Sequence, residues 1–117
     1  MMTVTKIYEF EAAHQLNKEC YGKCQNLHGH TYRLEVTVSD DGFNSDSEIV
    51  YNFTDLSEII RPIIKTLDHS FLNDLIPVPT AERIILWIIS KIQLPKNIIL
   101  EKVRLWETSN SYCTWSK

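Results

Sequence analysis

The chain has 117 residues and a formal net charge of −3, from 12 Lys and Arg against 15 Asp and Glu. This length suits one hydrophobic core, so we expect a single domain over residues 1–117. The acidic balance and the scattered basic residues argue against nucleic acid as a partner. Charged side chains interrupt every apolar run near the N-terminus, which argues against a secretion signal or a membrane span. The expected location is therefore cytoplasmic.

Two segments in the first third of the chain alternate apolar and polar side chains with a period of two. They are residues 3–14 and 30–39, and this period is typical of half-buried strands. The connection between them contains turn-forming residues and most of the reactive side chains. Because a long loop joins the two strands, we expect an antiparallel pair with functional groups in the connection.

The hydrophobic period becomes helical in the middle of the chain. Apolar residues recur with helical spacing from Leu56 to Leu67 and form one continuous stripe. Thr54 is the expected N-cap, and Asp55 in the first turn interacts favourably with the helix dipole. Pro62 lies inside the pattern, so we expect it to kink or shorten this helix.

A second helix and two further strands complete the predicted fold. The helix begins after Thr80, its expected N-cap, and ends before Pro95. Residues 98–108 and 111–116 are predicted to be strands. Because the strands do not alternate with the helices along the chain, the expected class is α+β. We expect an antiparallel four-stranded sheet with two helices packed on one face.

Three of the four histidines in the chain are predicted to meet at one end of the sheet. His28 and His30 begin the second strand, and their spacing places both side chains on the same face. His14 ends the first strand, which is expected to pair with the second. Three neutral imidazoles suit Zn²⁺ with an open fourth position for water or substrate. The alternative is that histidines at strand ends are simply polar residues that meet solvent.

Cys24 precedes the first of the paired histidines, His28, by four residues. A nearby dication lowers the pKa of a thiol and makes the thiolate available near neutral pH. Three interpretations stay open on local grounds: a fourth zinc ligand that closes a structural site, a base beside an open site, or an inert loop cysteine.

Two further groups are candidates for chemistry. Asp68 and His69 are adjacent and follow the first helix. They form either a proton-transfer unit, with the carboxylate orienting the imidazole, or a polar cap at the surface. Glu107 ends an apolar row in the third predicted strand. A carboxylate there is either a ligand for a small molecule or a solvated strand end.

Several motifs, taken in order, resemble one enzyme family over nearly the whole chain. They are FEAAHQL, CQNLHGHTYRLEV, VYNFTDL, LDHSFLND, PTAE and WET. The chain resembles the family of 6-pyruvoyl-tetrahydropterin synthases and 6-carboxy-tetrahydropterin synthases. This resemblance implies the tunnelling fold, or T-fold. It also implies a homo-oligomer, a hexamer built as a dimer of barrel-forming trimers, with active sites at subunit boundaries.

The resemblance also assigns roles to the candidate residues. It implies that the three histidines bind zinc and that Cys24 is the catalytic cysteine, so the site is open. It implies that Asp68 and His69 complete the proton-transfer set, and that Glu107 anchors the pterin ring. A carboxylate can accept from both the 2-amino group and the ring N–H of a pterin.

The spacing of the cysteine and the histidines distinguishes two branches of the family. The pattern C-x-x-x-H-G-H resembles the carboxy-forming enzyme of the queuosine (7-deazaguanine) pathway, whereas the gap is usually longer in pyruvoyl-forming enzymes. The expected activity is therefore a lyase that converts 7,8-dihydroneopterin triphosphate to 6-carboxytetrahydropterin, with release of acetaldehyde and triphosphate. Asn52 and Arg83 depart from the carboxy-forming pattern. The alternatives are a 6-pyruvoyl-tetrahydropterin synthase, a family member with an altered substrate, and a non-catalytic zinc-stabilised binding module.

Overall fold

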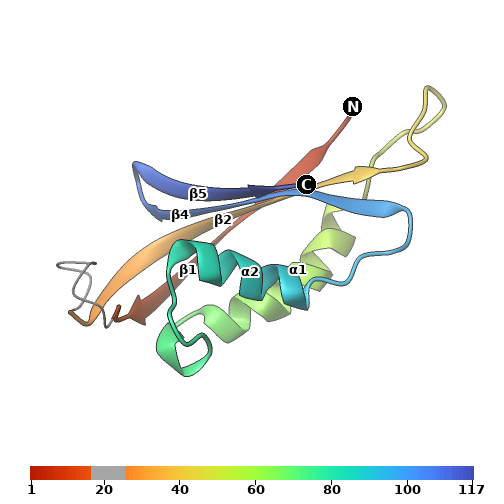
Figure 1. The fold of residues 1–117 in the computed structure, drawn as a ribbon. Helices are drawn as coiled ribbons and strands as arrows, with labels where there is room; N and C mark the ends of the chain where they lie inside the picture. Colours follow the sequence, from red (N-terminus) through yellow and green to blue (C-terminus); the bar gives the residue numbers. More distant parts are fainter. Residues whose placement is uncertain (17–25) are drawn as a thin grey trace.

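A computed structural model gives the structure of the chain and describes residues 1–16 and 26–117. Its described part contains one mixed sheet with the strand order β3-β1-β2-β4-β5. The strands are β1 (Val4–His14), β2 (His28–Asp40), β3 (Ser70–Phe71), β4 (Ile98–Thr108) and β5 (Ser111–Ser116). The helices are α1 (Phe53–Leu67), α2 (Ala81–Lys91) and the short 3-10 helix η2 (Leu72–Asp74). Figure 1 shows α1 and α2 beneath one face of the sheet, which leaves the other face without a helix.

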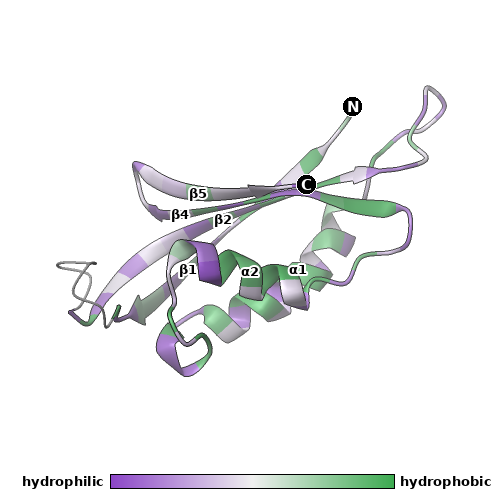
Figure 2. Cartoon of the chain, viewed as in Figure 1, coloured by the Kyte–Doolittle hydropathy of each residue, from purple (hydrophilic) through white to green (hydrophobic). Residues whose placement is uncertain are grey.

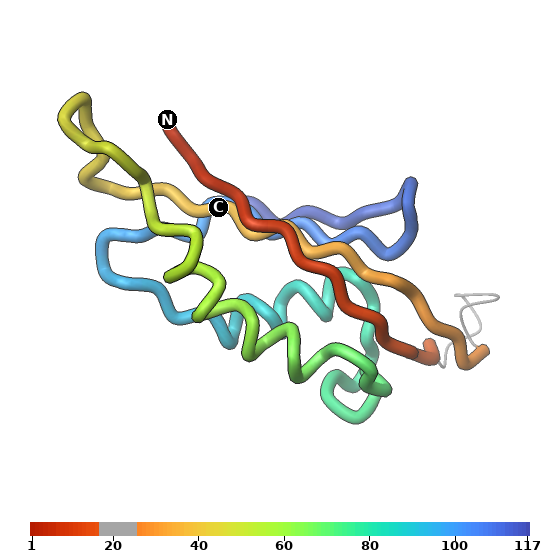
Figure 3. The backbone as a smooth tube through the Cα atoms, turned by 180° about the vertical axis from the view of Figure 1, so that it is seen from behind, coloured from red at the N-terminus to blue at the C-terminus, as the bar shows by residue number. Residues whose placement is uncertain are grey.

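The four long strands pair antiparallel, as predicted. β3 is an addition to the predicted sheet: its two residues pair parallel with the end of β1. A strand of two residues is too short to produce a hydrophobic period, so the pattern of the sequence could not reveal it. Figure 3 shows β1 and β2 running side by side to the same end of the sheet.

The core lies between the sheet and the two helices. Alternate residues of the strands, such as Phe10 in β1 and Leu34 in β2, are buried on the helix side. Ile60 of α1 and Ile88 of α2 are buried against them. In Figure 2 apolar and polar residues alternate along the strands, while the helices carry apolar residues toward the sheet. The period-two and helical patterns of the sequence therefore meet at one interface.

The beginning of α1 differs from the prediction. Its N-cap is Asn52, whose side-chain oxygen accepts from the backbone N–H of Thr54 at 2.8 Å. Thr54 is thus already inside the helix, and the predicted cap was wrong by two positions. The carboxy-forming pattern usually has Asp at this position. Because Asn and Asp cap helices equally well, Asn52 preserves the cap.

Pro62 does not shorten α1, which continues to Leu67. The proline is exposed, whereas Ile60 and Ile63 beside it are buried. Packing of this apolar stripe stabilises the helix despite the missing hydrogen bond. α2 begins as predicted: the backbone N–H of Arg83 donates to the Oγ1 of Thr80, its N-cap. No helix within the described ranges is both long and apolar enough to cross a membrane.

The cap of α1 can be tested by two substitutions at one position. Asn52→Ala removes the acceptor for the Thr54 N–H, so we expect the free energy of unfolding to fall by about 1 kcal/mol. Asn52→Asp keeps an acceptor and adds a charge that the helix dipole favours, so it should preserve or slightly raise stability. Urea unfolding of both variants measures this, and equal stabilities would contradict the capping role.

Candidate functional site: a histidine cluster beside a carboxylate

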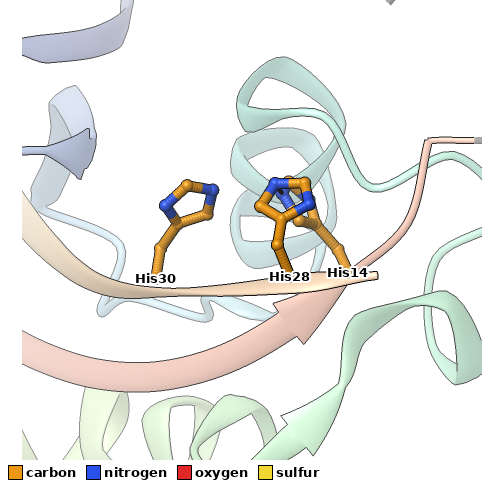
Figure 4. Close-up of side chains that lie close together, drawn as sticks. All are labelled: His14, His28 and His30. Atoms are coloured by element: carbon orange, nitrogen blue, oxygen red, sulfur yellow. Dashed lines mark hydrogen bonds between the residues drawn. The ribbon is translucent and has the colours of Figure 1, made fainter. Parts of the chain in front are cut away.

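Antiparallel pairing of β1 and β2 brings three histidines together at one end of the sheet. In the register, His14 lies opposite His28 and Ala12 lies opposite His30. Figure 4 shows the three rings standing on the same side of the strands. One ring nitrogen from each of the three lies within 4.8 Å of the others, a grouping that could hold a metal ion.

Backbone carbonyls orient two of the rings. The Nδ1 of His14 lies 2.8 Å from the carbonyl oxygen of Pro79, and the Nδ1 of His28 lies 2.6 Å from that of Asn26. A carbonyl oxygen can only accept, so each Nδ1 must carry the proton. In the neutral rings, each Nε2 is then left with a lone pair. A metal-binding histidine typically donates its other ring N–H to a backbone carbonyl in this way.

The two Nε2 atoms of His14 and His28 are 2.9 Å apart. Two lone pairs at this distance repel each other unless a cation or an additional proton lies beside them. The Nε2 of His30 is also buried and makes no hydrogen bond in the described structure. The lone pairs of three ring nitrogens therefore converge on one point. This arrangement fits a divalent transition metal, for which imidazole is a common ligand.

Glu107, at the end of the apolar row in β4, lies beside this cluster. Its Oε1 is 3.3 Å from the Nε2 of His30, although this contact is not a hydrogen bond. Burial lowers the pKa of His30, and the other two histidines lower it further, while Glu107 opposes them. His30 is therefore held as the neutral imidazole that metal binding requires. Glu107 also borders a hollow of about 200 Å³ between α2 and β5.

Asp68 and His69 form a close pair directly after α1. The Nδ1 of His69 is 2.9 Å from the Oδ2 of Asp68. Neighbouring side chains diverge in regular backbone, but His69 adopts a left-handed conformation with φ of 57°, which turns its ring back toward Asp68. The backbone N–H of Glu11, followed by the contacts with His69, lowers the pKa of Asp68, so this group stays a carboxylate.

The pair and the histidine cluster lie on different sides of the sheet. Alternation along β1 directs Glu11 to the helix-free face, opposite the face that carries His14. The Nε2 of His69 lies near the carboxylate of Glu11, at 3.9 Å. The chain thus brings the three histidines and Glu107 together. Asp68 and His69 make no contact with this group in the described structure, although His30 and His69 line one hollow. Cys24 lies outside the described residues.

Sequence reasoning missed several contributors to these two groups. The carbonyl oxygens of Asn26 and Pro79 carry no signal in the residue types, because every residue has a carbonyl. Glu11 had a detectable signal: it belongs to the FEAAHQL motif and lies three residues before His14. Its exposed place in the strand pattern made it look like an ordinary solvated side chain.

Comparison with known proteins identifies relatives along the whole chain. The family described as 6-pyruvoyl tetrahydropterin synthase matches residues 3–117. A 6-carboxy-5,6,7,8-tetrahydropterin synthase from Haemophilus influenzae is 32% identical over 100% of both chains. One of the same name from Synechocystis is 38% identical over 95% of this chain and 90% of its own. The structure of Caenorhabditis elegans 6-pyruvoyl tetrahydropterin synthase is 27% identical, with a TM-score of 0.79 over 99% of this chain and 95% of its own.

The histidine cluster predicts a specific loss of metal binding. His28→Ala removes one of the three converging nitrogens, so the affinity for a divalent transition metal should fall by more than about 100-fold. His69→Ala is the matched control and should keep full metal content, because its ring lies on the other side of the sheet. Metal analysis after dialysis against a weak chelator measures both. Full metal content in His28→Ala would show that the ligand set is wrong.

Proposed function

The chain belongs to the 6-pyruvoyl tetrahydropterin synthase family, and we propose that it is a zinc-dependent 6-carboxy-5,6,7,8-tetrahydropterin synthase. With one molecule of water as co-substrate, it would convert 7,8-dihydroneopterin triphosphate to 6-carboxytetrahydropterin and release acetaldehyde and triphosphate, in the queuosine (7-deazaguanine) pathway. The observation that carries the proposal is the convergence of three histidine nitrogens beside the carboxylate of Glu107. The C-x-x-x-H-G-H spacing and the two bacterial relatives support the carboxy-forming branch.

His14, His28 and His30 would hold the zinc through their Nε2 atoms, since two of the Nδ1 atoms are engaged by carbonyls. Bound there, zinc supplies a Lewis acid that lowers the pKa of substrate hydroxyls and polarises a carbonyl. Three imidazoles leave the fourth coordination position open. Glu107 is close enough to accept hydrogen bonds from the pterin ring while the side chain of the substrate lies over the histidines.

Proton transfer is the proposed role of the remaining residues. The thiolate of Cys24 takes a proton from the substrate side chain. Asp68 accepts from the Nδ1–H of His69, so the Nε2 of this ring is free to exchange a proton with the substrate. A base and an acid on opposite sides of the substrate allow a proton to be removed at one atom and delivered at another.

Separation of the two groups within one chain supports an assembly in which neighbouring chains complete each site. The histidine cluster faces the helix side of the sheet, whereas His69 lies by the helix-free face. Most of β1 and all of β5 also lie at the two edges of the sheet, where strands of other copies can pair. We therefore propose a homo-oligomer, a hexamer built as a dimer of trimers.

A second candidate is 6-pyruvoyl-tetrahydropterin synthase. The similarity to the Caenorhabditis elegans structure favours it, and so does Asn52, which pyruvoyl-forming members often share. Asn52 caps α1 with its side chain, whereas Arg83 contributes only its backbone N–H to the cap of α2, so nothing in the structure explains the Arg83 side chain. A non-catalytic zinc-binding module gives no reason for the Asp68–His69 pair or for Glu107 beside His30.

The product of the reaction tests the function directly. Incubation with 7,8-dihydroneopterin triphosphate should yield 6-carboxytetrahydropterin, acetaldehyde and triphosphate, identified by mass spectrometry. Cys24→Ala should retain about one zinc per chain and lose turnover by at least about 100-fold, because it lacks the base but not the ligands. A 6-pyruvoyl product would replace the proposal with the second candidate. Loss of zinc in Cys24→Ala would point to a closed structural site.

Glu107→Gln tests the pterin anchor without changing its size. The amide presents a donor where the carboxylate accepts from the ring, so pterin binding should weaken by about 2–4 kcal/mol. Glu82→Gln is the matched control, since Glu82 lines the same hollow but has no contact with His30. Calorimetry with a non-reactive pterin measures both affinities. Unchanged binding in Glu107→Gln would remove this residue from the site.

A further inference from the structure

Glu11 holds both members of the Asp68–His69 pair through its backbone. The backbone N–H of His69 donates to the carbonyl oxygen of Glu11 at 2.5 Å. The backbone N–H of Glu11 donates to the Oδ1 of Asp68 at 2.9 Å. These contacts continue the short parallel pairing of β1 with β3. They stabilise the left-handed backbone of His69, which costs energy for a residue with a side chain.

The side chain of Glu11 adds a second carboxylate to the pair. Its Oε2 lies 3.9 Å from the Nε2 of His69, and its Oε1 accepts from the hydroxyl of Thr31 at 3.1 Å. Thr31 lies directly opposite Glu11 in the β1–β2 register, so the sheet itself orients this carboxylate. The ring of His69 is thus flanked by Asp68 at Nδ1 and by Glu11 near Nε2.

The same residues line a hollow on the helix-free side of the sheet. Its volume is about 490 Å³, and its lining includes Glu11, Gly29, His30, Thr31 and His69. The hollow is large enough for part of a small molecule, and the exposed edge of the imidazole borders it. The ring of His69 is 75% exposed and the side chain of Glu11 is 63% exposed, so a ligand can reach both.

We propose that Glu11 is a positioning residue that holds the Nε2 edge of His69 toward this hollow and stabilises the ring when it carries a second proton. The inference rests on the proposed role of His69 in proton transfer and deepens it. At 3.9 Å a carboxylate attracts an imidazolium but does not form a hydrogen bond with it. Water screens the interaction because both groups are exposed, so its effect is modest. Asp68 and Glu11 are the charged groups found within contact distance of the ring in the described structure.

Substitutions that separate charge from shape test the proposal. Glu11→Gln keeps an oxygen for Thr31 but removes the charge, and kcat should fall about fivefold with unchanged KM and zinc content. Glu11→Asp restores the charge and should recover part of kcat. Glu9→Gln is the matched control: it lies on the same exposed side of β1, makes no contact with His69, and should behave as the unmodified chain.

A second measurement does not depend on the reaction. Diethyl pyrocarbonate acylates only the unprotonated imidazole, and peptide mass mapping reports the modification of His69 separately. At about pH 6, Glu11→Gln should raise this rate about two- to fivefold, because the ring loses the charge that favours its protonated form. Glu9→Gln should leave it unchanged.

The two measurements distinguish a failure of the role proposed for Glu11 from a failure of the proposed synthase activity. An unchanged modification rate in Glu11→Gln overturns the role of Glu11, whatever the enzyme makes. If Glu11→Gln raises the modification rate of His69 but leaves kcat unchanged, Glu11 does not position His69 for turnover. If the unmodified chain fails to act on dihydroneopterin triphosphate, the proposed function fails, while the modification rate still decides whether Glu11 stabilises protonated His69.

Discussion

The register between β1 and β2 is the constraint on which the rest of this structure depends. It places His14 opposite His28 and sets His30 beside them on the helix side of the sheet. Because side chains alternate along a strand, a shift of one residue in either strand would turn its histidines to the other face. The same shift would expose the apolar row that continues along both strands. Burial of the core therefore specifies the register, and the register assembles the candidate metal site.

Backbone carbonyls at the ends of α2 and β2 orient two of the histidine rings of that site. Pro79 precedes the N-cap of α2, and its carbonyl oxygen faces the Nδ1 of buried His14. The position of α2 on the sheet thus sets the tautomer of His14, a candidate metal ligand, and the start of β2 sets that of His28 through Asn26. Helix packing and ligand orientation are coupled, because the carbonyl that orients the ring belongs to the segment that leads into the helix.

The sheet also separates two kinds of chemistry. Its helix side carries the three clustered imidazoles beside Glu107, where burial lowers the pKa of His30. The helix-free side carries exposed His69 between two carboxylates, those of Asp68 and Glu11. This physical separation is the strongest structural argument for a site shared between chains.

Short-range patterns in the sequence determined most of the secondary structure and the meeting of the three histidines. Alternation in β1 and β2, the helical stripes, and the H-G-H triplet sufficed to predict the antiparallel pairs, the two helices on one face and the meeting of three histidines. These features follow from periods of two and of about 3.6 residues, which the order of residues carries directly. Only the tertiary structure decided the N-cap of α1, the pairing of β3, the tautomers of His14 and His28, and the turn of His69 toward Asp68. The pairing of β3, the tautomer of His14 and the turn of His69 depend on backbone groups of distant segments. The N-cap of α1 and the tautomer of His28 depend on backbone groups only two residues away. Backbone groups are the same in every residue, so no pattern of side chains specifies these contacts.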